Sequence, residues 1–199
     1  MKIFRFGLGI WIFAFLLLLP SLLSAGDATK QLSTTIDGFV PIISNTPREE
    51  LQANGMPESA RKLVLARFDF SEMTKRSLGQ HWNSLNRGEQ KQFVDAFTQW
   101  QLISYGRIVR SSRGDEVRFN RELQDGKDVS VETKVVRRYS EDLPIDYWLH
   151  NVNGQWKVYN MVIDHVDIVK NVRTQFDRVI AKSSLQELLQ KVKNQNPRS

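Results

Sequence analysis

The sequence predicts an α+β fold in which helices pack on a curved antiparallel sheet. Three observations predict it. Apolar residues recur at helical spacing before Gly114, alternate with polar residues after it, and return to helical spacing from Val166. Asp125-Gly126 and Asn153-Gly154 are turn signals between the alternating segments. This order of helices, strands and helices favours one layer of helices over one sheet.

The first 26 residues predict a secretory signal peptide. A basic start is followed by an unbroken apolar run over residues 10–19, and small residues precede the cleavage that we expect after Gly26. The alternative is an uncleaved N-terminal anchor, but the run ends at Pro20, short of the roughly 20 apolar residues that span a bilayer. We therefore expect one mature domain, residues 27–199.

Charge and cysteine content limit the function further. Removing Lys2 and Arg5 leaves 26 basic against 22 acidic residues, so the net charge falls from +6 to +4. The basic residues are scattered, which predicts transient contact with an anionic membrane surface and no nucleic-acid partner. The chain has no cysteine, which excludes disulfides, thiol catalysis and lipid attachment at a cysteine. An exported protein of this kind fits the bacterial periplasm.

Helical spacing and capping signals predict the helices of the first half. Residues 28–43 form an amphipathic helix whose apolar face needs a partner. Residues 46–49, Thr-Pro-Arg-Glu, read as a capping box that starts a second helix. Asp69 caps a short helix, and Asn86 opens a longer one with a stripe of large aromatic residues.

Alternation predicts the strands of the second half. Strands begin near Val117, Val129 and Ile145, and the last covers residues 156–163. The last strand is apolar at consecutive positions, so its apolar side chains should point to both faces, and each face needs a cover, one of which can be a ligand. The expected faces are Trp156, Val158 and Val162 on one side and Tyr159, Met161 and Ile163 on the other. We expect helix again from Val166.

The sequence offers little catalytic chemistry. His81, His150 and His165 lie far apart without the spacing of a metal site. Asp164, His165 and Asp167 form one carboxylate and imidazole cluster at a strand-to-helix junction, where aspartate commonly caps a helix, and we favour capping over catalysis there. Nucleophile-elbow and phosphate-loop motifs are absent from the sequence.

Four ordered segments carry a resemblance to a known family. They are residues 68–82, FDFSEMTKRSLGQHW; residues 89–97, EQKQFVDAF; residues 156–159, WKVY; and residues 171–176, NVRTQF. These segments resemble the MlaC family, periplasmic phospholipid-binding proteins also called toluene-tolerance auxiliary components of ABC transport systems. The resemblance covers essentially the whole mature chain, although the family usually has Glu-Gly where this chain has Asp164-His165.

The resemblance implies a cone-like domain of the nuclear-transport-factor type with a helical annex, enclosing an apolar pocket for acyl chains. It implies a phospholipid ligand without a cofactor, and as partners an inner-membrane ABC transporter complex and an outer-membrane lipoprotein or porin complex. From the large apolar residues on facing elements we expect seven to bind lipid: Phe97, Trp100, Ile103, Tyr147, Leu149, Val158 and Met161.

The leading hypothesis is therefore a monomeric, non-enzymatic periplasmic phospholipid shuttle that maintains outer-membrane lipid asymmetry. Three alternatives remain open at this point. The chain could carry another amphiphile such as a hopanoid. It could be an exported hydrolase that uses Asp164, His165 or Asp167, or a structural adaptor with a solid core and no ligand.

Overall fold

The structure is a computed structural model that describes residues 26–111, 115–137 and 140–194. The predicted signal peptide falls almost wholly on residues 1–25, which lie outside the described part. The helices before the sheet are α1 (Asp27–Asn45), α2 (Arg48–Asn54), α3 (Glu58–Arg67), α4 (Phe70–Leu78), the 3-10 helix η1 (Gly79–Ser84) and α5 (Arg87–Ser111). The strands are β1 (Glu116–Asp125), β2 (Asp128–Val136), β3 (Leu143–Val152), β4 (Gln155–Ile163) and β5 (Val166–Asp167), and the chain continues with α6 (Ile168–Lys182) and α7 (Leu185–Asn194).

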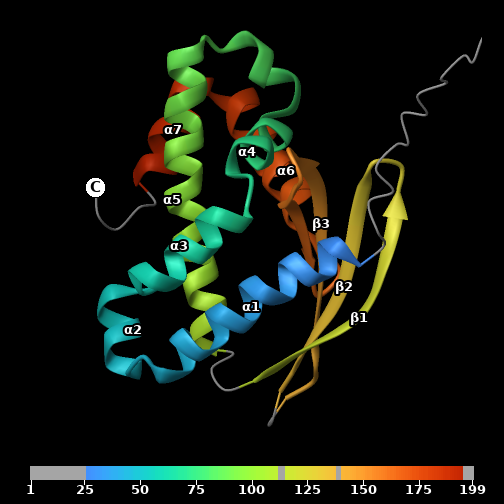
Figure 1. Cartoon of the computed structure of the whole chain (residues 1–199). Coiled ribbons are helices and arrows are strands. Elements are labelled where there is room, and N and C mark those ends of the chain that lie inside the picture. Colours follow the sequence, from blue (N-terminus) through green and yellow to red (C-terminus); the bar gives the residue numbers. More distant parts are fainter. Residues whose placement is uncertain (1–25, 112–114, 138–139, 195–199) are drawn as a thin grey trace, which may run out of the picture.

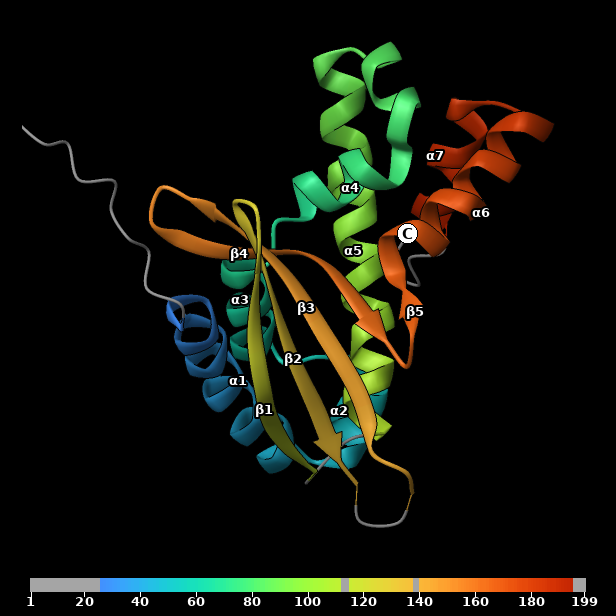
Figure 2. The same cartoon turned by 90° about the vertical axis from the view of Figure 1, so that its right-hand side faces the viewer.

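The five strands form one antiparallel sheet in the order β1-β2-β3-β4-β5. The sheet is strongly twisted, and α1 and α3 lie on one of its faces, with α2 and one end of α5 farther out on the same side (Figure 1). We call the face that α1 covers the inner face of the sheet. The other end of α5 lies beyond β4, next to α4, α6 and α7 (Figure 2). The predicted α+β architecture, helices over a curved antiparallel sheet, is confirmed.

Two of the three capping signals predicted in the first half of the chain have the expected bonds. Asp69 accepts a hydrogen bond from the Glu72 amide, and Asn86 and Glu89 exchange side-chain-to-backbone bonds of 2.9 and 3.0 Å in a complete capping box. The box expected at Thr46 is wrong. The Thr46 hydroxyl donates to the Ile42 carbonyl at 2.7 Å, so it is used at the end of α1, and α2 begins without a side-chain cap.

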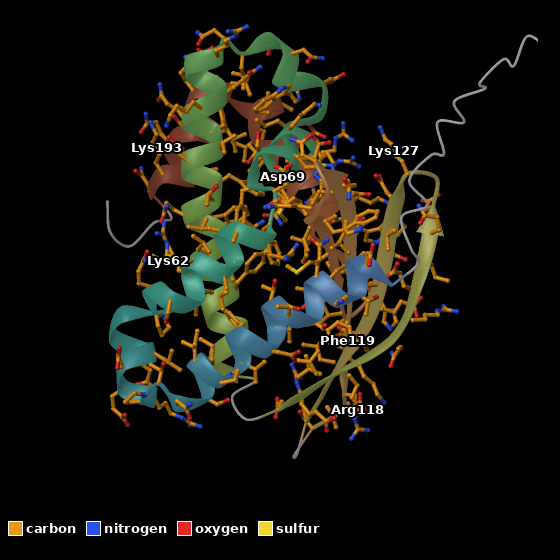
Figure 3. The ribbon with its side chains drawn as sticks, viewed as in Figure 1. Lys62, Asp69, Arg118, Phe119, Lys127 and Lys193 are labelled. Carbon is orange, nitrogen blue, oxygen red and sulfur yellow. The ribbon has the colours of Figure 1, made fainter. Side chains whose placement is uncertain are left out.

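Asp69 also ties α4 to the sheet. Its amide donates to the Val158 carbonyl at 2.8 Å, and its second carboxylate oxygen lies 3.1 Å from Nε2 of His150 on β3. Figure 3 labels Asp69 where α4 approaches the strands. The segment that caps the helix therefore also sets the position of the helix against β4.

A β-bulge in β4 corrects the predicted faces of that strand. Leu149 pairs with Val158 and Tyr147 pairs with Met161, so Tyr159 is an extra residue on β4. Because Tyr147 and Leu149 share a face of β3, their partners must share a face too. Val158 and Met161, expected on opposite faces, both point to the inner face. The strand therefore carries its large apolar residues mainly on one side.

A second bulge, in β1, turns an acidic residue inward. Phe119 pairs with Thr133 but Glu122 pairs with Val131, so the inward positions change from odd to even numbers between them. Figure 3 labels Phe119 and Arg118, which lie before the bulge and on opposite sides of β1. After the bulge Leu123 points outward and is 42 % exposed, which explains why a leucine on this strand lacks cover.

Glu122 caps the start of α1. Its carboxylate accepts hydrogen bonds from the Gly26 amide at 2.7 Å, the Thr29 amide at 2.9 Å and the Thr29 hydroxyl at 2.5 Å. A carboxylate at a helix N-terminus is also stabilised by the helix dipole. The inward turn of β1 thus fixes one end of the helix that covers the inner face.

Arg67 and Gln31 fix the middle of α1. The Arg67 guanidinium donates to Thr35 Oγ1 at 2.9 Å, to Gln31 Oε1 at 3.0 Å and to the Trp156 carbonyl at 2.5 Å. Gln31 Oε1 also accepts from the Trp156 amide, and its Nε2 donates to the Gly154 carbonyl. These bonds join α1, α3 and β4. The half-buried guanidinium of Arg67 is thus held by three neutral acceptors.

The residues after β4 form a turn and a strand where helix was expected. Asp164 and His165 adopt left-handed conformations with φ of 48° and 64°, which reverses the chain and pairs Val166 with Ile163. Val166 therefore belongs to β5, and Asp167 caps α6 by accepting from the Lys170 amide. Capping by Asp167 agrees with the structural interpretation of this cluster.

We expect Glu122→Gln to lower the free energy of unfolding by about 1–3 kcal/mol, because the amide loses the charge and turns a donor toward the N–H groups of α1. Urea denaturation measures the loss. Glu132→Gln is the matched control, since its carboxylate pairs with Arg121 on the exposed outer face, and the expected loss is below about 1 kcal/mol. Equal losses would contradict the capping role.

Candidate functional site

A pocket lies between α1 and the inner face of the sheet. The space between the two walls is about 660 Å³, a figure that includes open solvent at its mouth. From α1 its lining takes Leu32, Thr35, Ile36 and Phe39. From α3, α5 and the segments that flank α3 it takes Met56, Val64, Phe68 and Tyr105. From the sheet it takes Ile145, Tyr147, Met161 and Ile163.

The β4 bulge builds the sheet side of this pocket. Met161 and Ile163 pair with Tyr147 and Ile145 across β3 and β4, so four lining residues form two adjacent cross-strand pairs. Without the extra residue Tyr159, the pair Met161 and Ile163 would face away from α1. The pocket floor therefore depends on the change of face within β4.

Polar side chains are few in the lining and are limited to Thr35, Tyr105 and Tyr147. The Thr35 hydroxyl is occupied, because it donates to the Gln31 carbonyl and accepts from Arg67. The two phenols are the remaining polar groups. The pocket thus suits an apolar ligand that carries few polar atoms inside it.

The two tyrosines are held as neutral phenols. Burial raises the pKa of Tyr147 to about 12. Burial, together with the nearby Tyr147, raises the pKa of Tyr105 well above its usual value. The Tyr105 side chain is buried, its ring lies 5.8 Å from that of Phe68, and its hydroxyl has no hydrogen-bond partner among the residues the structure describes.

Two of the seven residues expected to bind lipid, Tyr147 and Met161, line the pocket. Leu149 and Val158 form a fully buried cross-strand pair in the core, and the other three lie on α5 outside this lining. Those three are Phe97, Trp100 and Ile103. Lipid contact by the seven residues stays a prediction.

Phe97 and Trp100 belong to an aromatic cluster near the middle of α5. Their ring centroids lie 5.8 Å apart, and the ring of Phe176 on α6 lies 6.3 Å from that of Phe97 and 6.2 Å from that of Trp100. Aromatic pairs at these distances stabilise helix packing. The aromatic stripe noted in the sequence therefore joins α5 to α6.

The main wall that sequence reasoning missed is α1. Its apolar stripe was recognised as a face in need of a partner, but helical spacing does not say which surface a helix covers. Leu32, Ile36 and Phe39 of that stripe supply the wall. A signal for this docking exists in Gln31 and Thr35, polar residues beside the stripe. Their hydrogen-bond partners are Arg67 on α3, Trp156 on β4 and Gly154 before β4, which are distant in sequence.

The residues of the carboxylate and imidazole cluster have structural roles. Asp167 is used in capping, and Asp164 and His165 form the turn before β5. Within residues 26–111, 115–137 and 140–194, no group of three or more His, Asp or Glu side chains could hold a metal ion. In the same ranges, no helix combines the length and apolar character needed to span a membrane.

The tyrosines generate a pH prediction. Free tyrosine ionises near pH 10, so the unfolded chain releases these protons before the folded protein does. The stabilisation from keeping Tyr147 neutral is complete below about pH 10 and is lost as the pH rises toward 12. Ultraviolet titration of native Tyr147→Phe should lack one ionisation near pH 12 that the parent protein has. Loss of an ionisation near pH 10 instead would contradict the burial of this phenol.

Three comparisons show which known proteins this chain resembles. A curated relative, toluene tolerance protein ttg2D of Pseudomonas putida, is 24% identical over 177 residues, which are 88% of this chain and 81% of that protein. A solved structure of a phospholipid-binding protein from Ralstonia solanacearum in complex with a phospholipid has the same fold. It superposes with a TM-score of 0.73 at 22% identity, over 86% of this chain and 98% of that one. Residues 34–194 match the family described as MlaC protein, and the chain therefore belongs to the MlaC family.

Proposed function

We propose that this chain is a non-enzymatic phospholipid carrier that holds acyl chains in the pocket between α1 and the sheet. The observation that carries the proposal is the nearly apolar lining of a pocket that opens to solvent. Membership of the MlaC family and the fold shared with a phospholipid-binding protein support it. A mouth open to solvent lets the charged headgroup stay hydrated while the tails are covered.

The energetics of lipid transfer explain why a carrier needs such a pocket. A diacyl phospholipid has roughly 30 methylene units at about 0.8 kcal/mol each, so exposing its tails to water costs on the order of 20 kcal/mol. Apolar side chains on both walls replace water around the tails. Headgroup contacts contribute little in this arrangement, and we expect weak selectivity for the headgroup.

We further propose that the carrier works in the periplasm, as a monomer that exchanges phospholipid between an outer-membrane complex and an inner-membrane ABC transporter. The predicted signal peptide and the family support this location. Cleavage after Gly26 would leave both hydrogen bonds from Thr29 to Glu122, so the mature chain keeps the α1 cap. Amino-terminal sequencing of the exported protein tests the site of cleavage.

Ile36→Glu should abolish lipid retention. Ile36 lines the pocket from α1, and a carboxylate there would have to be buried against acyl chains. The measurement is native mass spectrometry of residues 27–199, purified from a bacterial periplasm without detergent, followed by solvent extraction of the ligand. The parent protein should carry one phospholipid and Ile36→Glu should carry none.

Val166→Glu is the matched control, because it introduces the same charge on an apolar residue that is 46% exposed on β5. It should retain lipid. Circular dichroism verifies that both variants fold. A parent protein that carries no lipid and takes none from vesicles would contradict the carrier function and favour a structural adaptor. If the extracted ligand is a hopanoid, the protein is a carrier of that amphiphile and not of phospholipid. A hydrolase activity that is lost when Asp164, His165 and Asp167 are replaced by alanine would support the hydrolase alternative.

A further inference from the structure

The Tyr105 hydroxyl is a donor without an acceptor inside the pocket. Tyr105 lines the pocket, only 8% of it is exposed, and its hydroxyl has no partner among the described residues. Buried hydroxyls are normally hydrogen-bonded, because water solvates them in the unfolded chain and apolar surroundings do not. The hydroxyl is covered in the empty pocket, so an acceptor on the ligand reaches it when the entering lipid displaces the side chains around it.

The surroundings of Tyr105 select a neutral acceptor. The lining carries no Lys, Arg, Asp or Glu, and the neighbouring Arg67 directs its described bonds to Gln31, Thr35 and the Trp156 carbonyl. A phosphate would lose its hydration here without a counterion, at a high cost in free energy. A carbonyl oxygen is neutral, and one buried hydroxyl is enough to pair it.

The only neutral carbonyls of a diacyl phospholipid are its two esters, each attached directly to the first methylene of a tail. We propose that the Tyr105 hydroxyl donates a hydrogen bond to an ester carbonyl of the bound lipid, so that the pocket prefers ester-linked to ether-linked chains. The inference rests on the proposed carrier function and adds the chemical class that the pocket recognises. Tyr147 lies close enough to affect the ionisation of Tyr105 and keeps a second neutral phenol beside it.

Two lipids with the same headgroup and chain length test the proposal. Dipalmitoylphosphatidylglycerol has ester carbonyls, and its dihexadecyl ether analogue has none. Equimolar mixed vesicles of the two are offered to delipidated full-length mature protein, and native mass spectrometry gives the ratio bound. One hydrogen bond predicts about a two- to tenfold preference of the parent protein for the ester lipid.

Tyr105→Phe removes only the hydroxyl and should bring this ratio close to one while the protein still loads lipid. Without lipid the variant should be at least as stable as the parent, because an unsatisfied buried donor has been removed. Tyr159→Phe is the matched control. Its hydroxyl donates to Asp128 at 3.0 Å and lies outside the pocket lining, so the ester preference should remain.

The outcomes separate this inference from the carrier function. Equal loading of both lipids by the parent protein would overturn the ester contact alone. An ester preference that persists in Tyr105→Phe would also overturn it, and would indicate that another group recognises the ester. Loading of neither lipid by the parent would overturn the carrier function, and the ester contact with it.

Discussion

The extra residue in β4 is the constraint on which the pocket depends. Tyr159 interrupts the alternation between Val158 and Met161, and both side chains consequently face α1. The first part of the strand then packs in the core beside Leu149, while the second part forms the pocket floor. β4 therefore contributes to both the core and the pocket. Because of the extra residue, apolar side chains before and after the bulge point to the same inner face.

The bulge in β1 has a related effect at the edge of the sheet that β1 forms. It brings Glu122 inward, where the carboxylate caps α1, and Arg67 and Gln31 hold the same helix in its middle. Polar bonds therefore fix α1 at its start and along one side. Its apolar side chains are left to line the pocket, so α1 stays in place without filling the space below it.

Sequence reasoning succeeded where the signals are local. The strand boundaries follow from alternation and from the two glycine turns, and the Asn86 cap was recognisable because both partners lie within three residues. The cap expected at Thr46 failed because Thr46 ends α1, where its hydroxyl donates to the Ile42 carbonyl, and α2 begins after Pro47 without a side-chain cap. The face of Met161 failed because a bulge is decided by cross-strand register, which alternation within one strand does not contain.

The same distinction applies to the pocket. Tyr147, Met161, Phe97 and Trp100 were all chosen as large apolar residues on facing elements. The first two line the pocket floor, whereas Phe97 and Trp100 pack against Phe176 of α6. The unpaired hydroxyl of Tyr105 has no sequence signal, since it depends on what the neighbouring elements leave empty. Such a group becomes visible only when every potential partner in space is known.

The most direct test of the carrier function is a crystal structure of the mature protein loaded with a phospholipid that carries bromine atoms on its acyl chains. Anomalous scattering locates the bromine atoms without reference to the rest of the ligand. We predict peaks between α1 and the β3–β4 floor, in contact with Ile36 and Met161. Peaks confined to another surface, with this pocket empty, would contradict the proposed site.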